Sequence, residues 1–324
     1  MTMRYRLLGR TGLRVSEVFL GTMTFGGPST GAEEARRIVD AYADAGGNVV
    51  DTASAYGDSE ALLGEVLTRR DRFVLATKFT LSRDRSDPNG AGGHRKNLRL
   101  SLERSLRRLR TDHVDLLWVH TWDRHTPMEE TLRALDDAVR AGQVLYVGIS
   151  DAPAWVVSRA DALAEWRAWT PFAAVQVPYN LVDRDVEREV LPMAEALGLS
   201  VAAFGTLGHG VLAGSTGRVP QPTARQRAAA AAVRAVADEL GTTPTGVAIA
   251  WTRARSAAVH PLVGVRTADQ VADVVAAADL VLPDELRARL EAAAPFEPGP
   301  LADFMAESAA SPFVFGDAEV LGRR

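Results

Sequence analysis

Cysteine is absent from this sequence of 324 residues, and lysine is almost absent. Without cysteine the chain has no disulfide and no thiolate metal site, and cysteine usage says nothing about the redox compartment. Of the 37 lysine and arginine residues, only Lys78 and Lys96 are lysines. Because arginine supplies nearly every positive charge, a lysine in a defined structural position calls for a specific reason.

Long hydrophobic runs and a basic surplus are also missing. No apolar run approaches the roughly 18 residues that span a bilayer, and the N-terminal MTMRYRLLGRTG lacks the apolar core of a signal peptide. The net charge of -4 disfavours nucleic-acid and anionic-membrane partners, which select basic surfaces. With 47% hydrophobic and 24% charged residues the chain has an ordinary globular composition. We expect a cytoplasmic protein that acts on a small molecule, and a homo-oligomer remains possible.

Short apolar runs alternate with longer amphipathic segments along the chain. The runs are VFLG (18–21), NVVD (48–51), FVLATK (73–78), VDLLWVH (114–120), VLYVGIS (144–150), FAAVQV (172–177), SVAAF (200–204) and VHPLVG (259–264). Between them, segments such as 32–46, 95–110 and 127–142 repeat apolar residues at three- and four-residue spacing, which indicates helices. The alternation predicts parallel strands with helical crossovers.

The number of strand–helix units predicts a (β/α)8 TIM barrel formed by one domain over residues 1–324. Two short extended stretches, 4–8 and 13–20, flank turn residues and predict an N-terminal β-hairpin that leads into the first barrel strand. An open dinucleotide-binding sheet is disfavoured, because GTMTFGG (21–27) lacks the G-x-G-x-x-G spacing. The Gly- and Pro-rich stretch 206–226 is expected to form a functional flap, and the tail 298–324 is expected to cover the active-site face.

Polar residues end several of the apolar runs. In a parallel barrel the carboxyl ends of the strands meet at one rim, where active sites form. Asp51 and Lys78 end consecutive runs and are expected to meet there, because a buried lysine without a partner would lose its charge. Tyr56 follows Asp51 by five residues and can fold back over the pair.

A tyrosine beside an ammonium is a candidate general acid. We expect Lys78 to lower the pKa of Tyr56 from its ordinary value of about 10 toward the working range. Arginine would also hold the carboxylate, but its planar fork has a different geometry, which gives a reason for lysine at this position. His120 ends the fourth run and is expected to donate a hydrogen bond to a carbonyl oxygen at the same point.

Each of these residues also has a structural interpretation. Asp51 is equally suited to capping a loop or helix, and Tyr56 to lining a loop. Lys78 on its own is compatible with a rim ion pair, and His120 with a structural histidine. Their occurrence together at successive strand ends favours a catalytic group. The histidines show no spacing typical of metal ligands, so no metal site is predicted.

The chain resembles the aldo-keto reductase superfamily, and within it the bacterial members related to the potassium-channel β subunits. The resemblance rests on GTMTFG (21–26), DTASAYGDSE (51–60), ATKF (76–79), 95–123, GISDAPAW (148–155), QVPYNLVDRDVEREVLP (176–192) and PLVGVRTADQ (261–270). It implies NADPH-dependent reduction of an aldehyde or ketone to an alcohol. It also implies Tyr56 as proton donor, Lys78 and Asp51 as its tuning pair, and His120 as an orienting donor.

The resemblance implies a set of cofactor-binding residues as well. Ser150, Asp151 and Gln176 are expected to contact the nicotinamide carboxamide, and Phe204 to stack on its ring. Arg266 is expected to bind the 2'-phosphate of NADP, with Gln270 near the adenine ribose. The remaining implied contacts are Gly21, Thr22, Gly205, Leu207 and Gly210. The sequence departs from the family pattern where Asp151 replaces Asn, Phe204 replaces Tyr or Trp, and GTLGHG (205–210) replaces a Ser-Pro-Leu start.

Two other functions remain compatible with these residues. The first is a cofactor-binding regulatory protein of the channel β-subunit type, with little turnover. The second is a lyase that uses Lys78 as a Schiff base, which borohydride trapping would reveal. Trp122, two residues past His120, is a candidate wall of the substrate pocket.

Overall fold

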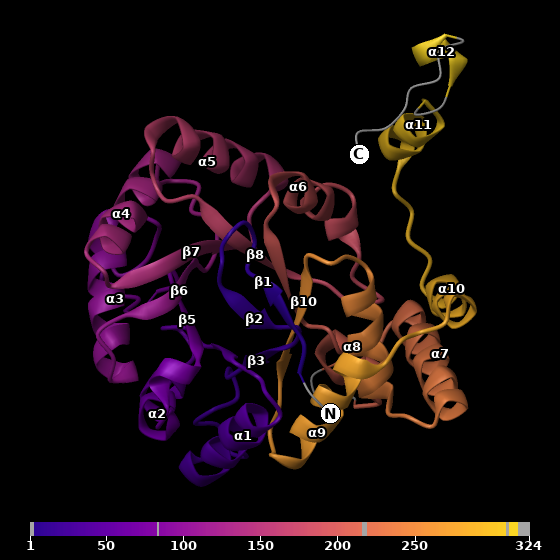
Figure 1. The fold of residues 1–324 in the computed structure, drawn as a ribbon, viewed down its shortest axis with the longest axis horizontal. Coiled ribbons are helices and arrows are strands. Elements are labelled where there is room, and N and C mark those ends of the chain that lie inside the picture. Colours follow the sequence, from indigo (N-terminus) through magenta and orange to yellow (C-terminus); the bar gives the residue numbers. More distant parts are fainter. Residues whose placement is uncertain (1–2, 83, 216–218, 309–310, 317–324) are drawn as a thin grey trace.

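The computed structural model of this chain describes residues 3–82, 84–215, 219–308 and 311–316. Parallel strands close into a barrel in the order β10-β3-β4-β5-β6-β7-β8-β9, surrounded by helices (Figure 1). The strands are β1 (Tyr5–Leu7), β2 (Arg14–Ser16), β3 (Phe19–Gly21), β4 (Val49–Asp51), β5 (Val74–Phe79), β6 (Val114–Val119), β7 (Val144–Ser150), β8 (Phe172–Pro178), β9 (Ser200–Phe204) and β10 (Val259–Gly264). The predicted (β/α)8 TIM barrel with an N-terminal hairpin is confirmed.

The helices follow the strands as crossovers. The α-helices are α1 (Ala32–Asp44), α2 (Ser59–Val66), α3 (Arg95–Leu109), α4 (Met128–Arg140), α5 (Ala154–Arg167), α6 (Val190–Leu197), α7 (Ala224–Leu240), α8 (Pro244–Ala254), α9 (Asp269–Asp279), α10 (Asp284–Ala293), α11 (Pro300–Ser308) and α12 (Pro312–Phe315). The 3-10 helices are η1 (Arg70–Arg72), η2 (Asp185–Glu187) and η3 (Gly208–Ala213). In α1, the residues Ala35, Ile38, Val39 and Tyr42 are buried, which places the apolar stripe of the helix against the barrel.

Side chains fill the interior of the barrel, so the barrel is not a pore. Trp118 on β6 is fully buried in the inner cluster, together with Phe19 and Val49. Leu8 and Val15, from the two sides of the hairpin, belong to the same cluster and close the barrel at the amino ends of its strands. Because this end is plugged, a pocket for chemistry is left only at the carboxyl ends.

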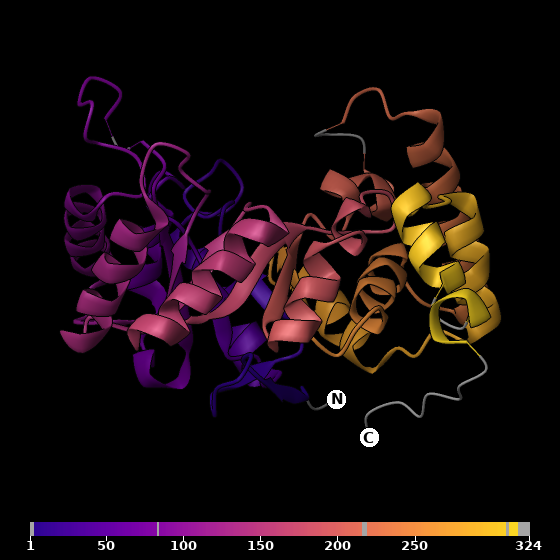
Figure 2. The same cartoon turned by 90° about the horizontal axis from the view of Figure 1, so that it is seen from above.

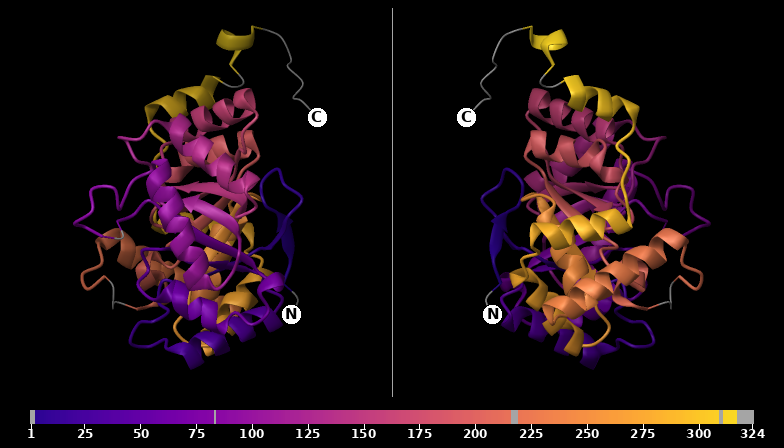
Figure 3. Two further views of the ribbon diagram at one scale, coloured as in Figure 1. Left: turned by 90° about the vertical axis from the view of Figure 1, so that its left-hand side faces the viewer. Right: turned by 90° about the vertical axis from the view of Figure 1, so that its right-hand side faces the viewer.

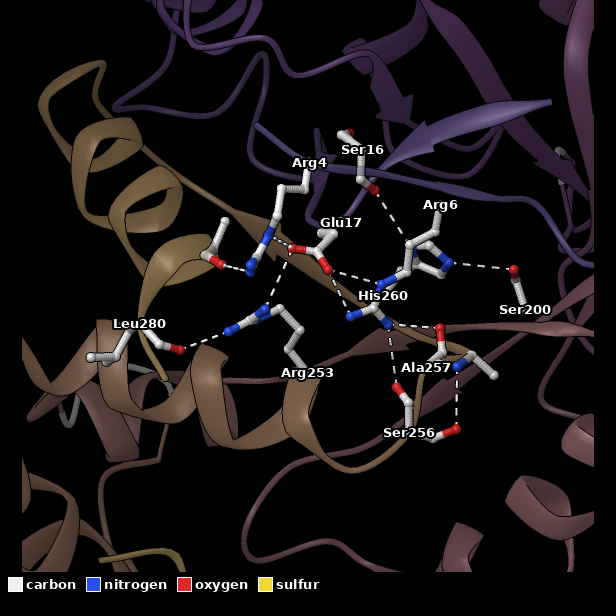
Figure 4. A network of polar contacts seen from close by, with 12 residues as sticks. Arg4, Arg6, Ser16, Glu17, Ser200, Arg253, Ser256, Ala257, His260 and Leu280 are labelled. Carbon is white, nitrogen blue, oxygen red and sulfur yellow. Dashed lines mark hydrogen bonds and ion pairs between the residues drawn. The ribbon is translucent and has the colours of Figure 1, made fainter. Parts of the chain in front are cut away.

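A buried carboxylate joins the hairpin to the barrel. Glu17 forms ion pairs with Arg6 at 2.7 Å, with Arg4 at 2.9 Å and with Arg253 of α8 at 3.4 Å. Figure 4 shows these side chains converging on Glu17, with His260 of β10 beside Arg6. Burial raises the pKa of Glu17, but Arg6, Arg253 and Arg4 together hold it below its ordinary value. The hairpin is therefore fixed by charge as well as by packing.

The loops after β5 and β9 rise on the face opposite the hairpin (Figure 2). The second of these was predicted to be an irregular flap over 206–226, but it contains η3, and α7 begins at Ala224 behind a capping box of Thr223 and Gln226. Residues 216–218 of this prediction lie outside the described residues.

The C-terminal helices differ from the expected position. We expected residues 298–324 to cover the active-site face, but α11 and α12 lie to one side of the barrel, beyond the ring of helices (Figure 3). No residue of α11 is buried, so this helix forms little contact with the rest of the chain. Residues 309–310 and 317–324 of this prediction lie outside the described residues.

Candidate active site

Asp51 and Lys78 form an ion pair at the carboxyl ends of β4 and β5. The Lys78 ammonium donates to Asp51 Oδ1 and also to the Thr52 carbonyl oxygen at 2.9 Å. Both side chains are almost completely buried, with 1% of Lys78 and 2% of Asp51 exposed. A charge removed from water requires such a partner and further hydrogen bonds. The two acceptors fit the compact ammonium of a lysine.

Gln176 completes the buried pair from across the barrel. Its Nε2 donates to Asp51 Oδ2 at 3.1 Å, so each carboxylate oxygen of Asp51 accepts one side-chain hydrogen bond. The sequence did not predict this contact, because Gln176 was assigned only to the cofactor. Its amide oxygen has no hydrogen bond among the described residues and can still accept one from a ligand.

Backbone pairing brings Tyr56 back over the ion pair. Beyond β4 the chain continues to pair with β5, through Thr52 N–H to the Ala76 carbonyl and Ser54 N–H to the Lys78 carbonyl. A turn then closes with Tyr56 N–H donating to the Ala53 carbonyl at 3.0 Å. The Lys78 ammonium lies 4.8 Å from the centroid of the Tyr56 ring.

The pKa of Tyr56 is raised, not lowered as the sequence predicted. Burial of the phenol is the largest influence and raises the pKa, and the charge of Lys78 acts in the opposite direction without overcoming it. Asp51 adds a further increase, because its carboxylate disfavours a nearby phenolate. The prediction considered the ammonium and omitted desolvation. Lys78 therefore makes Tyr56 more acidic than burial alone would leave it.

His120 follows β6 and packs edge-on against Tyr56, with ring centroids 5.7 Å apart. Burial and the charge of Lys78 lower the pKa of His120 to about 3, so the imidazole is neutral at ordinary pH. Its Nδ1 is buried and has no hydrogen-bond partner among the described residues. A neutral imidazole with a free nitrogen can donate to, or accept from, a polar ligand.

Ser150 and Gln176 are aligned at the ends of β7 and β8, where they are register partners. Asp151 follows with a positive φ of 47°, and its N–H donates to the Gln176 carbonyl at 3.1 Å. Burial raises the pKa of Asp151, opposed by Lys78. These predicted cofactor residues thus lie on neighbouring strands at the same rim as the ion pair.

The loop after β9 has a run of left-handed backbone. Phe204 ends the strand and is partly buried against the inner cluster, and Gly205, Gly208, His209 and Gly210 all have positive φ values. The Gly205 carbonyl is held by Asn180 Nδ2 at 3.0 Å. Leu207 is partly buried and packs against a second hydrophobic cluster, which includes Leu212 and Val233. Successive turns of this kind can present backbone N–H groups to an anion. Within this loop, Gly208 N–H donates to the Gly205 carbonyl at 2.8 Å and Gly210 N–H to the Leu207 carbonyl at 2.9 Å.

Arg266 and Gln270 lie just beyond β10. The Arg266 N–H donates to Gln270 Oε1 at 2.8 Å, so the Gln270 side chain is engaged with the loop itself. The Arg266 side chain is exposed, and its guanidinium has no ion-pair partner among the described residues. It is therefore available to bind a phosphate.

The first strand contributes Gly21, which ends β3, and then Thr22. The Thr22 side chain is fully buried, donates to the Asp51 carbonyl at 3.0 Å and contacts the Ser59 hydroxyl at 2.9 Å. Its hydroxyl therefore supports the loop that carries Tyr56. Its backbone oxygen also accepts from Phe25 N–H at 2.9 Å and from the Ser59 hydroxyl at 2.8 Å, so the contact of Thr22 with a cofactor stays a prediction.

Sequence reasoning missed a second buried acid close to the site. Glu60 accepts from the Thr77 hydroxyl at 2.7 Å and pairs with Arg108 at 3.3 Å. Thr77 precedes Lys78 on β5, so this acid fixes the strand that carries the lysine. The spacing of Glu60 from Tyr56 gave no signal, because Glu60 lies within an ordinary helical pattern. Ser54 Oγ, also missed, is buried without a partner among the described residues.

Comparisons with known proteins identify the family of this chain. A model described as the aldo/keto reductase family matches residues 17–295. A norsolorinic acid reductase of Emericella nidulans is 40% identical over 321 residues, covering 92% of this chain and 83% of that protein. An aryl-alcohol dehydrogenase of Pestalotiopsis microspora is 36% identical over 306 residues, covering 87% and 80%. A putative aryl-alcohol dehydrogenase of Saccharomyces cerevisiae is 34% identical over 330 residues, covering 91% and 88%.

These relatives correct one expectation from the sequence motifs. The motifs indicated bacterial proteins related to channel β subunits, whereas the relatives above are fungal and bear the names of oxidoreductases. No helix among the described residues is long and apolar enough to cross a membrane.

Proposed function

Since this chain belongs to the aldo/keto reductase family, we propose that it uses NADPH to reduce an aryl aldehyde or ketone to the alcohol. Family membership implies a nicotinamide cofactor and a small carbonyl substrate. The observation that carries the proposal is the position of Lys78, which holds Asp51 and lies against the ring of Tyr56. The names of the relatives, norsolorinic acid reductase and aryl-alcohol dehydrogenase, support the choice of an aryl substrate.

Tyr56 is the proposed proton donor. When bound, the nicotinamide supplies a hydride to the carbonyl carbon, and the carbonyl oxygen then needs one proton to become a hydroxyl. Because the pKa of Tyr56 is raised, the phenol carries its proton at neutral pH. As the proton leaves, the Lys78 ammonium stabilises the developing phenolate, and water later restores the proton.

His120 and Asp51 act on this step without giving up the proton themselves. Neutral His120 donates a hydrogen bond to the carbonyl oxygen and orients it toward Tyr56. Asp51 supplies the counter-charge that a buried ammonium requires, and it fixes the position of Lys78 beside Tyr56. The lyase alternative fits less well. A Schiff base requires the Lys78 amine to attack a carbonyl carbon, but this amine is held by hydrogen bonds to Asp51 and to the Thr52 carbonyl oxygen.

The residues around the rim fit a nicotinamide dinucleotide. Ser150 and the free amide oxygen of Gln176 would hold the carboxamide, and the glycine-rich backbone after Phe204 would hold the pyrophosphate. The unpaired guanidinium of Arg266 would hold the 2'-phosphate, which favours NADPH over NADH.

Replacement of Tyr56 tests the proton donor. We expect Tyr56→Phe to reduce kcat by at least about a hundredfold, because general acid catalysis contributes on the order of 10² to 10⁴. NADPH binding, followed by protein fluorescence, should not change. Equal losses of binding and turnover would instead assign Tyr56 to folding. If the wild type binds NADPH but reduces no carbonyl compound, the regulatory alternative is favoured.

Replacement of Arg266 tests the cofactor preference. In Arg266→Ala we expect the Kd for NADPH to rise by about tenfold or more, as for loss of a charge-assisted contact, with little change for NADH. Arg36→Ala, an exposed arginine of α1, is the control. Equal weakening of the two cofactors would show that Arg266 does not contact the 2'-phosphate.

A further inference from the structure

A hollow of about 310 Å³ lies beside the candidate active site. It is formed between the segment after β6 and the start of α5. The residues that line it are Trp122, Arg124, His125, Thr126, Pro127, Met128, Glu129, Trp155, Val156 and Arg159. Tyr56, Lys78 and His120 do not line it, so it is a separate place from the ion pair.

Residues of the hollow are nevertheless connected to the strand ends that carry the candidate active site. Trp122 follows His120 by two residues, and its N–H donates to the carbonyl of Asp151 at 3.5 Å. Trp155 lies on α5, in the crossover that follows Asp151 and Ser150. A ligand that extends outward from His120 between these two crossovers would therefore reach the hollow.

Two tryptophans form its aromatic wall. The rings of Trp122 and Trp155 pack edge to face, with centroids 5.4 Å apart and an interplanar angle of 86°. Trp155 is 56% exposed, so much of a large aromatic surface has no protein partner. A flat aromatic ligand can stack on such an indole and remove both surfaces from water.

The basic side chains of the hollow exceed its acidic ones. Arg159 is paired with Glu129 at 2.7 Å, so these two charges balance. The Arg124 guanidinium lies 5.4 Å from the Trp122 ring centroid and has no ion-pair partner among the described residues. Arg124 therefore leaves one positive charge next to the aromatic wall, in a chain whose net charge is -4.

We propose that this hollow is a subsite for the far end of an elongated, planar aromatic carbonyl compound that carries an anionic group, such as a carboxylate. Trp155 stacks on the far ring, and Arg124 pairs with the anion. This inference rests on the proposed function, because it places the reacting carbonyl at Tyr56. It adds that the preferred substrate is longer than a single ring and is acidic at the end remote from the carbonyl.

The same helix provides a matched control. Trp166, near the C-terminal end of α5, is 75% exposed, and the guanidinium of Arg167 lies 4.6 Å from its ring centroid. This second tryptophan–arginine pair has the same chemistry but does not line the hollow. Trp166→Ala and Arg167→Gln therefore report on the loss of an exposed tryptophan or arginine by itself.

The kinetic test uses two aldehydes that differ only in charge, 6-formyl-2-naphthoic acid and its methyl ester. We expect the wild type to prefer the acid in kcat/KM. Because exposed cation–π and ionic contacts are modest, the acid-to-ester ratio should fall about fivefold in Arg124→Gln. We expect kcat/KM for both compounds to fall about tenfold in Trp155→Ala, through KM. Trp166→Ala and Arg167→Gln should keep the wild-type values.

A binding measurement separates this inference from the proposed function. 2-Naphthoate has no reducible carbonyl, and its binding is measured by calorimetry in the presence of NADP. We expect its Kd to rise in Trp155→Ala and Arg124→Gln and not in the Trp166 and Arg167 variants. If none of benzaldehyde, 6-formyl-2-naphthoic acid and its methyl ester is reduced, the proposed function fails whatever this result. If any of these aldehydes is reduced but neither the naphthoate Kd nor the acid-to-ester ratio changes in the hollow variants, the subsite inference is wrong.

Discussion

Lys78 shows at the scale of one residue why lysine occurs where this chain otherwise uses arginine. Its ammonium contacts Asp51 Oδ1 and the Thr52 carbonyl within a space that leaves 1% of the residue exposed. A guanidinium is planar and larger, so it would not reach both acceptors without displacing Tyr56. The shape of the cation, and not only its charge, therefore explains why this position is occupied by lysine.

Removal of one member of the buried pair should be more harmful than removal of both. We expect Lys78→Met to lower the free energy of unfolding by about 3–5 kcal/mol, because Asp51 is left buried and charged. The double variant Asp51→Asn, Lys78→Met should recover a large part of this loss. Urea unfolding of the single and double variants measures both values. A double variant as unstable as the sum of the single variants would show that the pair does not interact.

The pKa directions of Tyr56 and His120 define a pH profile. Tyr56, with its raised pKa, keeps its proton well into the alkaline range, and His120, with a pKa of about 3, is neutral above pH 4. We expect kcat/KM to be nearly constant from about pH 5 upward and to fall only above the ordinary tyrosine pKa of 10.0, as Tyr56 loses its proton. A decline centred near the ordinary histidine pKa of 6.5 would show that His120 titrates in the active enzyme.

At this scale the sequence predicted which residues meet and that Lys78 is buried, but not how strongly burial affects the Tyr56 phenol. The positions of Asp51, Lys78 and His120 at strand ends, with Tyr56 in the loop after Asp51, were sufficient to predict their approach. The direction of the Tyr56 pKa depends on desolvation, which follows from the packing of the loop and is not encoded in spacing. The bond between Gln176 and Asp51 joins residues 125 positions apart, and no local pattern indicates it.

At the scale of elements, the hairpin is held to the barrel by Glu17 and its three arginines. We expect Glu17→Gln to lower the free energy of unfolding by about 2–3 kcal/mol, because the arginines lose their shared counter-charge in a largely buried site. Glu103→Gln is the control. Its pair with Arg99 is an exposed i,i+4 pair on α3, which contributes about 0.3–0.5 kcal/mol. Chemical denaturation of both variants gives the comparison, and equal effects would contradict a special role for Glu17.

The strands and the hairpin were predictable, because buried runs of four to seven apolar residues have clear ends and alternate with amphipathic segments of helical period. The predicted bounds of the barrel strands agree with the structure to within about one residue, whereas the predicted stretch 13–20 contains β2 and ends within β3. The positions of α11 and of the η3 turn were not predictable from the sequence. Gly-rich segments and apolar C-terminal segments carry no period that fixes their direction, and the side on which they lie depends on tertiary contacts. Trp122 was predicted as a wall of the substrate pocket, but Trp155 was not, because it lies on a different crossover and no local pattern joins the two.

For the whole molecule, buried histidines predict acid sensitivity. Burial lowers the pKa of His260 from 6.5 to about 4, with a further decrease from Arg6. Between these pH values the unfolded chain binds a proton at His260 and the folded chain does not. The free energy of unfolding therefore falls as the pH decreases from 6.5 to about 4. The full difference is on the order of 3 kcal/mol for this residue.

This prediction is tested by unfolding at pH 7.5 and pH 4.5. We expect the stability lost between the two pH values to be smaller in His260→Gln than in the wild type, even if the variant is less stable at both. His125→Gln, which changes an exposed histidine, should keep the wild-type difference. An unchanged difference in His260→Gln would assign the acid sensitivity to other groups.

The scarcity of lysine has a practical result for the intact protein. Lys78 is enclosed and engaged, whereas Lys96 is exposed on α3, away from the ion pair. Reagents that acylate amines should therefore attach to side chains only at Lys96, besides the α-amine. A dye or a solid support can thus be coupled at a defined position without disturbing the enclosed amine. Because cysteine is absent, a single introduced thiol would provide a second, independent attachment point anywhere on the surface.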